Sequence, residues 1–273
     1  MCRLFGYVST AATTVDTILG AQALEQFTAL SRHHGDGWGT AWWAPADTGQ
    51  DSQRAYRSPG PACSDPIFAE QTNSVASSAR IVHLRWATPG LPVHPDNTHP
   101  FMADGMSFAH NGSVMPPESV AFLLDPTFAE SLRGSTDSER YFALVRQEIA
   151  TGSDGTIAAV RRAVRTLRRM FPIASLNALL LSRSELIVVH ANSIEDTPEL
   201  KGMPAGESPP LDHLEAYYLM RWRREADHTI AFTSSGLPDT GWIPLPDSSV
   251  TRVDLADLTM RTELVDPTGT ITV

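Results

Sequence analysis

A cysteine stands at position 2, directly after the initiator methionine, in the segment MCRLFGYV. Once methionine is removed, this thiol shares its α-carbon with a free amine. A thiol pKa of about 8.5 and an α-amine pKa of about 7.7–8.0 are closely matched, so moving the proton from sulfur to nitrogen costs roughly 1 kcal/mol or less. The amine is a suitable base, and Cys2 is a candidate nucleophile. The alternative is a cysteine that is incidental to function.

A pair of hydrogen-bond donors lies in the segment FAHNGSV, residues 108–114. Asn-Gly is a strong turn signal, so a plain hairpin turn at Asn111–Gly112 is the first interpretation. The second is an oxyanion hole, in which the Asn side-chain amide and the Gly backbone N–H donate to one developing negative charge.

An arginine and an aspartate of opposite charge suit the two ends of an amino acid. The segment RWATPG brings the guanidinium of Arg85 and the hydroxyl of Thr88 to a Pro-Gly turn, and paired guanidinium donors match a carboxylate. The segment STDSE places Asp137 at a predicted helix start, where it could hold an ammonium group. A surface salt bridge for Arg85 and a capping role for Asp137 stay open as simpler interpretations.

The elements that must position these residues are mainly short strands, with a few longer helices. Strand-like runs cover 3–8, 38–43, 79–87, 106–112, 175–182, 185–191, 228–235, 248–255 and 259–265. Helical patterns cover 17–33, 137–150 and the arginine-rich 161–170, whose arginines are expected on a solvated face. A hairpin turn is expected at 183–184 and a surface loop at 197–212. This order predicts an α+β fold, in one domain over residues 1–273.

Composition narrows the classes of partner. The net charge of −10 disfavours nucleic acid and anionic membranes. No apolar run reaches the ~18–20 residues of a membrane helix, and the start lacks the features of a secretory signal, so we expect a cytoplasmic protein. The two cysteines, Cys2 and Cys63, make no disulfide framework, and nothing suggests a role for Cys63.

Five segments occur in one order: the N-terminal cysteine, DGWG, RWAT, HNG and TDSE. In this order they resemble the class II glutamine amidotransferases, cysteine members of the N-terminal nucleophile (Ntn) hydrolases, and most closely the standalone proteins of the YafJ type. The resemblance covers essentially the whole chain. It implies a four-layer αββα sandwich, in agreement with the α+β prediction, and no cofactor.

The resemblance also implies catalytic roles. Cys2 would attack the γ-carboxamide carbon of glutamine while its own amine accepts and returns the proton. Asn111 and the Gly112 amide would hold the oxyanion. Ammonia would leave, and water would then release glutamate from the γ-glutamyl thioester, so the expected activity is that of an N-terminal cysteine amidohydrolase.

Substrate-binding roles follow from the same resemblance. Arg85 and Thr88 would hold the α-carboxylate, and Asp137 with the Gly112 carbonyl would hold the α-ammonium group. Trp86 would lie in the turn that shields the pocket. One departure concerns the residue after Thr88, which is usually His in sugar-phosphate-forming relatives and is Pro89 here. This removes one ligand for the carboxylate and leaves strict glutamine specificity open.

Three alternatives stay open in the sequence. The substrate is either glutamine or a larger γ-glutamyl amide of the ergothioneine-pathway type, which differs in its leaving group. The chain could also supply ammonia to a partner synthetase, and its oligomeric state, including a homo-oligomer, is undetermined. A metal site at His94, Asp96 and His99 is disfavoured because their spacing matches no well-defined zinc motif; we expect no metal, and expect His99 to be a hydrogen-bonded residue near the pocket.

Overall fold

Two seven-stranded antiparallel sheets face each other at the centre of the computed structural model, which describes residues 2–44, 52–87, 90–192, 217–225, 228–238, 240–266 and 270–271. In spatial order, the first sheet contains β11 (Ile243–Pro244), β9 (Met220–Glu225), β10 (Thr229–Ser234), β1 (Arg3–Thr13), β4 (Ser77–Leu84), β2 (Trp38–Ala44) and β3 (Ser52–Ser58). The second contains β14 (Thr270–Ile271), β13 (Met260–Leu264), β12 (Ser249–Asp254), β8 (Glu185–His190), β7 (Asn177–Leu181), β6 (Met106–Asn111) and β5 (Phe101–Ala103).

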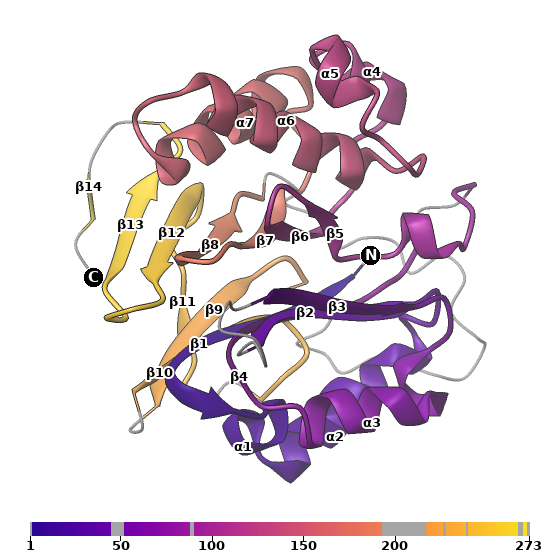
Figure 1. Ribbon diagram of the computed structural model, residues 1–273, viewed down its shortest axis with the longest axis vertical. Helices are drawn as coiled ribbons and strands as arrows, with labels where there is room; N and C mark the ends of the chain where they lie inside the picture. The colour runs from indigo at the N-terminus through magenta and orange to yellow at the C-terminus, as the bar shows by residue number, and fades with distance from the viewer. Residues whose placement is uncertain are drawn as a thin grey trace.

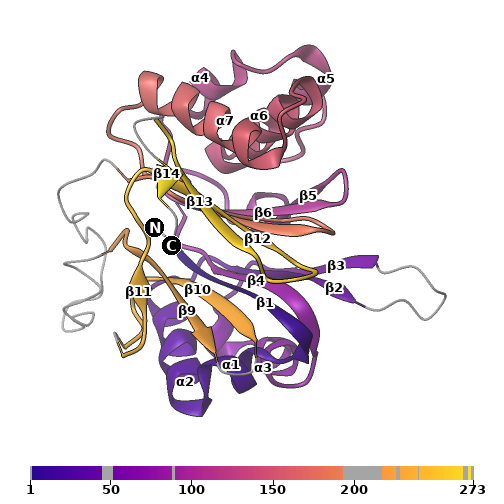
Figure 2. The same cartoon turned by 90° about the vertical axis from the view of Figure 1, so that its left-hand side faces the viewer.

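Helices cover the outer face of each sheet (Figure 1). The first sheet carries α1 (Val15–Leu19), α2 (Ala21–Ala29) and α3 (Pro66–Asn73). The second carries α4 (Pro117–Ala121), α5 (Pro126–Ala129), α6 (Asp137–Thr151) and α7 (Thr156–Met170). Three 3-10 turns complete the described elements: η1 (Leu30–Arg32), η2 (Ala62–Ser64) and η3 (Pro95–Asn97). Figure 2 shows the same four layers from the side, which confirms the predicted α+β, αββα architecture.

Three hydrophobic cores hold the four layers together. One lies between the first sheet and its helices and includes Phe5, Phe27 and Trp38. A second fills the space between the two sheets, and the third packs α6 and α7 against the second sheet. Because each strand turns alternate side chains to opposite faces, two packed sheets covered by helices bury both faces of their central strands. This burial explains the nearly continuous apolar runs in β7 and β8.

Most of the predicted elements are confirmed, including the hairpin of β7 and β8. The helix predicted at 137–150 is confirmed as α6, and it begins at Asp137, where the Thr136 side chain accepts a hydrogen bond from the Glu139 amide at 3.1 Å. The arginine-rich helix is confirmed as α7, with its apolar residues buried and Arg162 paired with Glu148 and Asp154.

Two expectations about local structure are wrong. The helical pattern at 17–33 divides into α1, α2 and η1, because Gly20 adopts a φ of 77° between the first two. A positive φ interrupts a right-handed helix and is readily adopted by glycine. The Asn111–Gly112 pair is not a hairpin turn. β6 ends at Asn111 and pairs with β5, which precedes it, and with β7, which follows only after the helices α4 to α7. The loop expected at 197–212 lies outside the described residues.

Among the described residues, no helix is both long enough and apolar enough to cross a membrane.

Candidate active site

Strand pairing places Cys2 at the centre of the molecule. β1 lies between β4 and β10 in the first sheet, and its first residue, Arg3, pairs with Leu84, the last residue of β4. Since the two strands are antiparallel, the residue before β1 lies beside the turn that follows β4. The Cys2 sulfur accordingly lies 3.7 Å from the carbonyl oxygen of Trp86, and the Cys2 side chain is buried.

The backbone of Cys2 is held at both ends. Its N–H donates to Asn111 Oδ1 at 3.0 Å, across 109 positions of sequence. Its carbonyl oxygen accepts from Arg3 Nη1 at 2.9 Å, and the fully buried Arg3 guanidinium lies 4.0 Å from the centre of the Tyr217 ring. Burial raises the pKa of the Cys2 thiol, while the nearby Arg85 and Arg3 charges act in the opposite direction. A thiol with a raised pKa is protonated at neutral pH and needs a base before it can attack a carbonyl.

Asn111 has one unused hydrogen-bonding group. Its side chain is fully buried, and its Nδ2 has no hydrogen-bond partner among the described residues. A buried donor without a partner costs about 1–3 kcal/mol, so such a group is uncommon unless a ligand supplies the acceptor. The Asn111 carbonyl, by contrast, accepts from Ser175 Oγ at 3.0 Å, which fixes the backbone at this point.

The backbone around Gly112 leaves no room for a side chain. A Cβ at this position would lie 1.9 Å from the Ser175 carbonyl oxygen and 2.6 Å from His110 Nε2. Real Cβ atoms do not approach backbone this closely. The absence of a side chain therefore lets the end of β6 pack against residue 175, with Gly112 on the wall of the same pocket as Cys2.

The turn after β4 is supported by the glycine-rich segment 33–39. Asp36 Oδ2 accepts from the Ala87 amide at 2.7 Å, and the Asp36 amide donates to the Arg85 carbonyl at 3.1 Å. Arg85 in turn donates through Nη1 to the Asp36 carbonyl at 3.1 Å and through Nη2 to the Pro92 carbonyl at 3.2 Å. In the sequence, the segment DGWG counts only as one of five ordered motifs, and nothing singles out Asp36 beyond its place between two glycines.

Arg85 is a buried cation rather than a partner in a surface salt bridge. Its side chain is 3% exposed, and burial lowers its pKa while the charges of Cys2, Asp36 and Asp137 act to raise it. Asp137 is also buried, at the first position of α6, and its Oδ2 accepts from the Val114 amide at 2.6 Å. The carboxylate thus contacts the segment after β6 rather than only capping its own helix.

A small pocket brings together most of the predicted residues. Its walls include Cys2, Arg85, Trp86, Gly112 and Asp137, and Asn111 adjoins it through its hydrogen bond to Cys2. One cation and one anion therefore line a small pocket that also contains a thiol. Thr88 and Pro89 lie outside the described residues.

Three histidines adjoin the pocket, and sequence reasoning gave little weight to them. His99 lines the pocket, yet both its ring nitrogens lack a hydrogen-bond partner among the described residues, contrary to the expectation of a hydrogen-bonded residue. Its ring lies 4.1 Å from that of His83, centre to centre. His110 contacts Ser138 Oγ and the Ser175 carbonyl, each at 2.9 Å. Burial lowers the pKa of all three, that of His83 to about 3.

The residues weighed as a metal site do not converge. His94 Nδ1 lies 3.4 Å from Asp96 Oδ2 at the surface, whereas His99 is buried against His83 and Phe101. In the part of the chain that the structure describes, no group of three or more His, Cys, Asp or Glu side chains is arranged to hold a metal ion.

Two known proteins are similar in sequence to part of this chain. The gamma-glutamyl-hercynylcysteine sulfoxide hydrolase of Mycobacterium tuberculosis is 29% identical over 122 residues, 42% of this chain and 50% of that protein. A glutamine–fructose-6-phosphate aminotransferase of Methanothermobacter thermautotrophicus is 29% identical over 170 residues, 56% of this chain and 27% of that enzyme. The matched region thus spans half of the first relative and about a quarter of the second.

Solved structures share the fold at low sequence identity. A glutamine aminotransferase class-II domain protein from Silicibacter pomeroyi superposes with a TM-score of 0.63 at 20% identity, covering 97% of this chain and 100% of that one. A predicted glutamine amidotransferase from Pseudomonas aeruginosa gives a TM-score of 0.54 at 17% identity, covering 94% and 99%. Residues 1–202 match the sequence profile of the class-II glutamine amidotransferases. The chain therefore belongs to the class II glutamine amidotransferase family.

Proposed function

We propose that this protein is an amidohydrolase that cleaves the γ-carboxamide of glutamine with Cys2 as its nucleophile. The observation that carries the proposal is the convergence of a thiol and two opposite charges in one small pocket, beside an amide donor that has no partner among the described residues. The role requires removal of Met1, so that the Cys2 nitrogen becomes an amine. Intact mass of the purified protein tests this condition directly.

The chemistry begins with proton transfer from the thiol to the adjacent amine. The sulfur then forms a bond to the γ-carbonyl carbon, and the negative charge develops on the carbonyl oxygen. Asn111 Nδ2 and the Gly112 amide donate to this oxygen, where preorganised donors stabilise a transition state without reorganisation. The proton that the Cys2 amine accepted passes to the leaving nitrogen of the substrate. The C–N bond then breaks, and ammonia departs from a γ-glutamyl thioester. Water then adds to the thioester carbon and releases glutamate and the thiol.

Binding of the amino-acid end uses the two buried charges. Arg85 pairs with the α-carboxylate and Asp137 with the α-ammonium group, so that the γ-carboxamide extends toward Cys2. A bound zwitterion would give each of these charges a partner, which matters because a charge buried without one is costly. Trp86 closes the turn beside the sulfur, and Thr88 would add a hydroxyl to the carboxylate.

Replacing the nucleophile is the decisive experiment. Cys2→Ala is expected to abolish glutamate release while the far-ultraviolet circular dichroism and the melting temperature stay close to those of the parent protein. Cys63→Ala is the matched control, because Cys63 is an exposed free thiol with no place in the pocket. Glutamate release by Cys2→Ala at the parental rate would contradict the proposal.

A second candidate substrate is a γ-glutamyl amide with a larger amine. The similarity to the mycobacterial gamma-glutamyl-hercynylcysteine sulfoxide hydrolase favours it, as does Pro89 in place of a carboxylate ligand. The acyl half of the reaction is unchanged. Comparing kcat/KM for glutamine with that for γ-glutamyl amides of increasing size separates the two candidates, because both release glutamate and differ only in the amine. If glutamine is preferred, ammonia supply to a partner synthetase becomes the physiological role to test.

A further inference from the structure

His99 lines the pocket of Cys2 and has no role in the chemistry proposed above. Its side chain is only 4% exposed, and neither ring nitrogen has a hydrogen-bond partner among the described residues. The nearby buried His110 is, by contrast, held at both ring nitrogens, by Ser138 Oγ and by the Ser175 carbonyl. Buried polar groups are rarely left unpaired in native proteins, because they have given up their hydrogen bonds to water. Two unpaired nitrogens on a pocket wall therefore indicate a contact with the ligand.

The orientation of the His99 ring is fixed by its neighbours. The ring lies 4.1 Å from that of His83 and 4.7 Å from that of Phe101, centre to centre, and neither contact engages a ring nitrogen of His99 in a hydrogen bond. The backbone is equally constrained, since the His99 carbonyl packs against Gly39 so closely that a Cβ there would clash with it. A side chain held in this way is preorganised, so a ligand binds to it at little cost in conformational entropy.

The segment that carries His99 is tied both to Arg85 and to the start of α6. The Pro92 carbonyl accepts from Arg85 Nη2 at 3.2 Å and from Asn97 Nδ2 at 3.1 Å. Asn97 Oδ1 in turn accepts from the Ser135 amide at 2.9 Å, two residues before α6 begins. Because Arg85 lines the same pocket, these contacts hold His99 beside the residue that binds the α-carboxylate in the proposed function.

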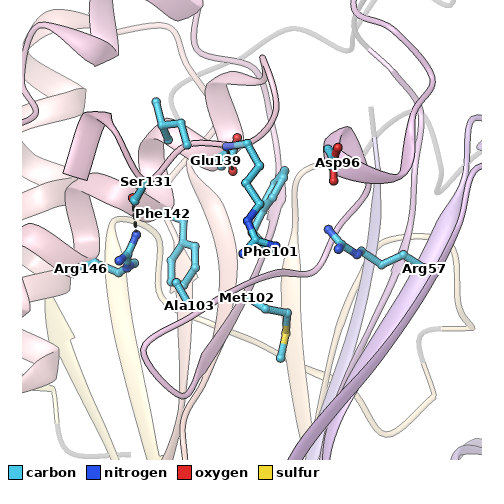
Figure 3. A pocket seen from close by; sticks show the side chains of 11 residues that line it. Arg57, Asp96, Phe101, Met102, Ala103, Ser131, Glu139, Phe142 and Arg146 are labelled. Atoms are coloured by element: carbon cyan, nitrogen blue, oxygen red, sulfur yellow. Dashed lines mark hydrogen bonds between the residues drawn. The ribbon is translucent and has the colours of Figure 1, made fainter. Parts of the chain in front are cut away.

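His99 is a neutral hydrogen-bond donor at pH 7. Burial lowers its pKa well below the usual 6.5, and the charges of Arg85 and Arg57 act in the same direction. A neutral imidazole has one N–H donor and one acceptor nitrogen. Arg57 lines a different pocket, where Figure 3 shows it pointing toward the same space as the carboxylate of Asp96. Arg85 is thus the cation that shares a pocket with His99 and attracts an anion to it.

A carboxylate bound at Arg85 has acceptors to spare for a second donor. Arg85 already gives one N–H to the Asp36 carbonyl and one to the Pro92 carbonyl, of the five that a guanidinium has. A carboxylate offers about four lone-pair sites on its two oxygens. The remaining Arg85 donors and one imidazole N–H can therefore bind the same group without competing.

We propose that His99 is a substrate-binding residue whose imidazole N–H donates a hydrogen bond to the α-carboxylate, beside Arg85. The identity of this substrate rests on the proposed function, whereas the contact itself concerns binding alone. The α-carboxylate does not change during cleavage at the γ-carbon, so the contact is equally strong in the ground state and in the transition state. It therefore lowers KM and leaves kcat unchanged.

Three variants of the full-length protein test this contact. His99→Phe keeps the aromatic ring and removes both nitrogens, and it is expected to raise KM for glutamine at least about tenfold, with kcat within about twofold of the parent. His99→Gln restores a donor and should recover most of the loss. His228→Asn is the matched control, because His228 is exposed, does not line the pocket, and has a φ of 64° that asparagine adopts readily. Thermal unfolding of each variant confirms that the comparison is between folded proteins.

The role of the carboxylate is tested with the α-amide of glutamine, in which a neutral carboxamide replaces the α-carboxylate. Because hydrogen bonds to a charged acceptor are stronger than those to a neutral one, His99→Phe should lower kcat/KM much less for this compound than for glutamine. Calorimetry with L-glutamate gives a readout that is independent of turnover. His99→Phe should bind L-glutamate at least about tenfold more weakly than the parent does.

The outcomes separate this inference from the proposed function. An unchanged KM in His99→Phe, a fall in kcat alone, or an equal loss for glutamine and its α-amide would overturn the role of His99, while glutamate release by the parent protein upholds the proposed function. No binding of L-glutamate to the parent would also overturn the contact. If the parent releases no glutamate from glutamine but binds L-glutamate through His99, the proposed function fails and the contact stands.

Discussion

At the scale of single residues, Asn111 shows most directly how the fold prepares a reaction. One end of its side chain, Oδ1, holds the Cys2 nitrogen, and the other, Nδ2, is buried with no partner among the described residues. Folding alone would favour a residue that satisfies both groups. A cost of about 1–3 kcal/mol is instead accepted at this position, which is typical of a donor whose acceptor arrives with the substrate.

The Asn111 amide donor can be tested with two variants. Asn111→Ala removes both contacts, whereas Asn111→Asp keeps an oxygen for the Cys2 nitrogen and loses the donor. Both are expected to lower kcat for glutamate release by roughly 10²–10³-fold, the usual effect of one oxyanion donor. Steady-state kinetics on folded variants provide the measurement. Near-parental kcat in Asn111→Asp would show that the oxygen contact matters and the donor does not.

Arg3 is expected to influence the ionisation of the neighbouring thiol. Its charge lowers the pKa of Cys2 against the larger effect of burial, which raises it. Arg3→Gln should therefore raise the thiol pKa further and move the acid limb of the kcat/KM profile to higher pH. Arg3→Lys keeps the charge and should leave the limb near its parental position. A loss of rate in Arg3→Gln that is uniform across pH would point to a structural role instead.

At the scale of elements, the site depends on where strands end. Cys2 precedes β1, Arg85 follows β4, and Asn111 closes β6. Strand-like runs in the sequence predicted these strands, and the segment STDSE indicated the start of α6. No local pattern indicates that β1 pairs with β4, or that residues 2 and 111 meet, because such pairings depend on packing across the whole chain. Their convergence was expected only from the order of five motifs that resemble one family.

The close packing after the end of β6 leaves no room for a side chain at Gly112. A Cβ there would lie 1.9 Å from the Ser175 carbonyl, so Gly112→Ala must push two backbone segments apart. Overpacking of this kind costs about 1–3 kcal/mol, and the free energy of unfolding from urea titration should fall by that amount. Gly60→Ala is the control: its nearest neighbour would be 3.9 Å away, so stability should hardly change. Equal stability of the two variants would contradict the steric argument.

At the scale of the whole molecule, the two sheets are joined through buried histidines as well as through apolar packing. His83 belongs to β4 in the first sheet, and its Nε2 lies 3.3 Å from the carbonyl of His110 in β6 of the second. His99 packs on His83 and on Phe101. Sequence patterns predicted the four layers through the family resemblance but not this cluster, because a histidine in an apolar run does not reveal which sheet face it meets. The single-domain organisation stays a prediction.

The buried cluster should make the fold sensitive to acid. Burial lowers the pKa of His83 to about 3 and that of His99 well below its usual value, whereas histidines in the unfolded chain titrate near 6.5. Below about pH 6.5 the unfolded state therefore binds protons that the folded state does not. The free energy of unfolding decreases as the pH is lowered, until the pKa of the folded state is reached.

His99→Phe isolates one contribution to this pH dependence. The substitution keeps an aromatic ring beside His83 and Phe101 and removes two ring nitrogens that have no described partner. One fewer proton is then taken up on unfolding. Below pH ~6.5 the free energy of unfolding should depend on pH less steeply, by up to about 1.4 kcal/mol per pH unit. Urea titrations at several pH values measure the slope. An identical slope in His99→Phe and the parent would mean that His99 takes up its proton in the folded protein, and that the buried histidine cluster between the sheets tolerates a charge.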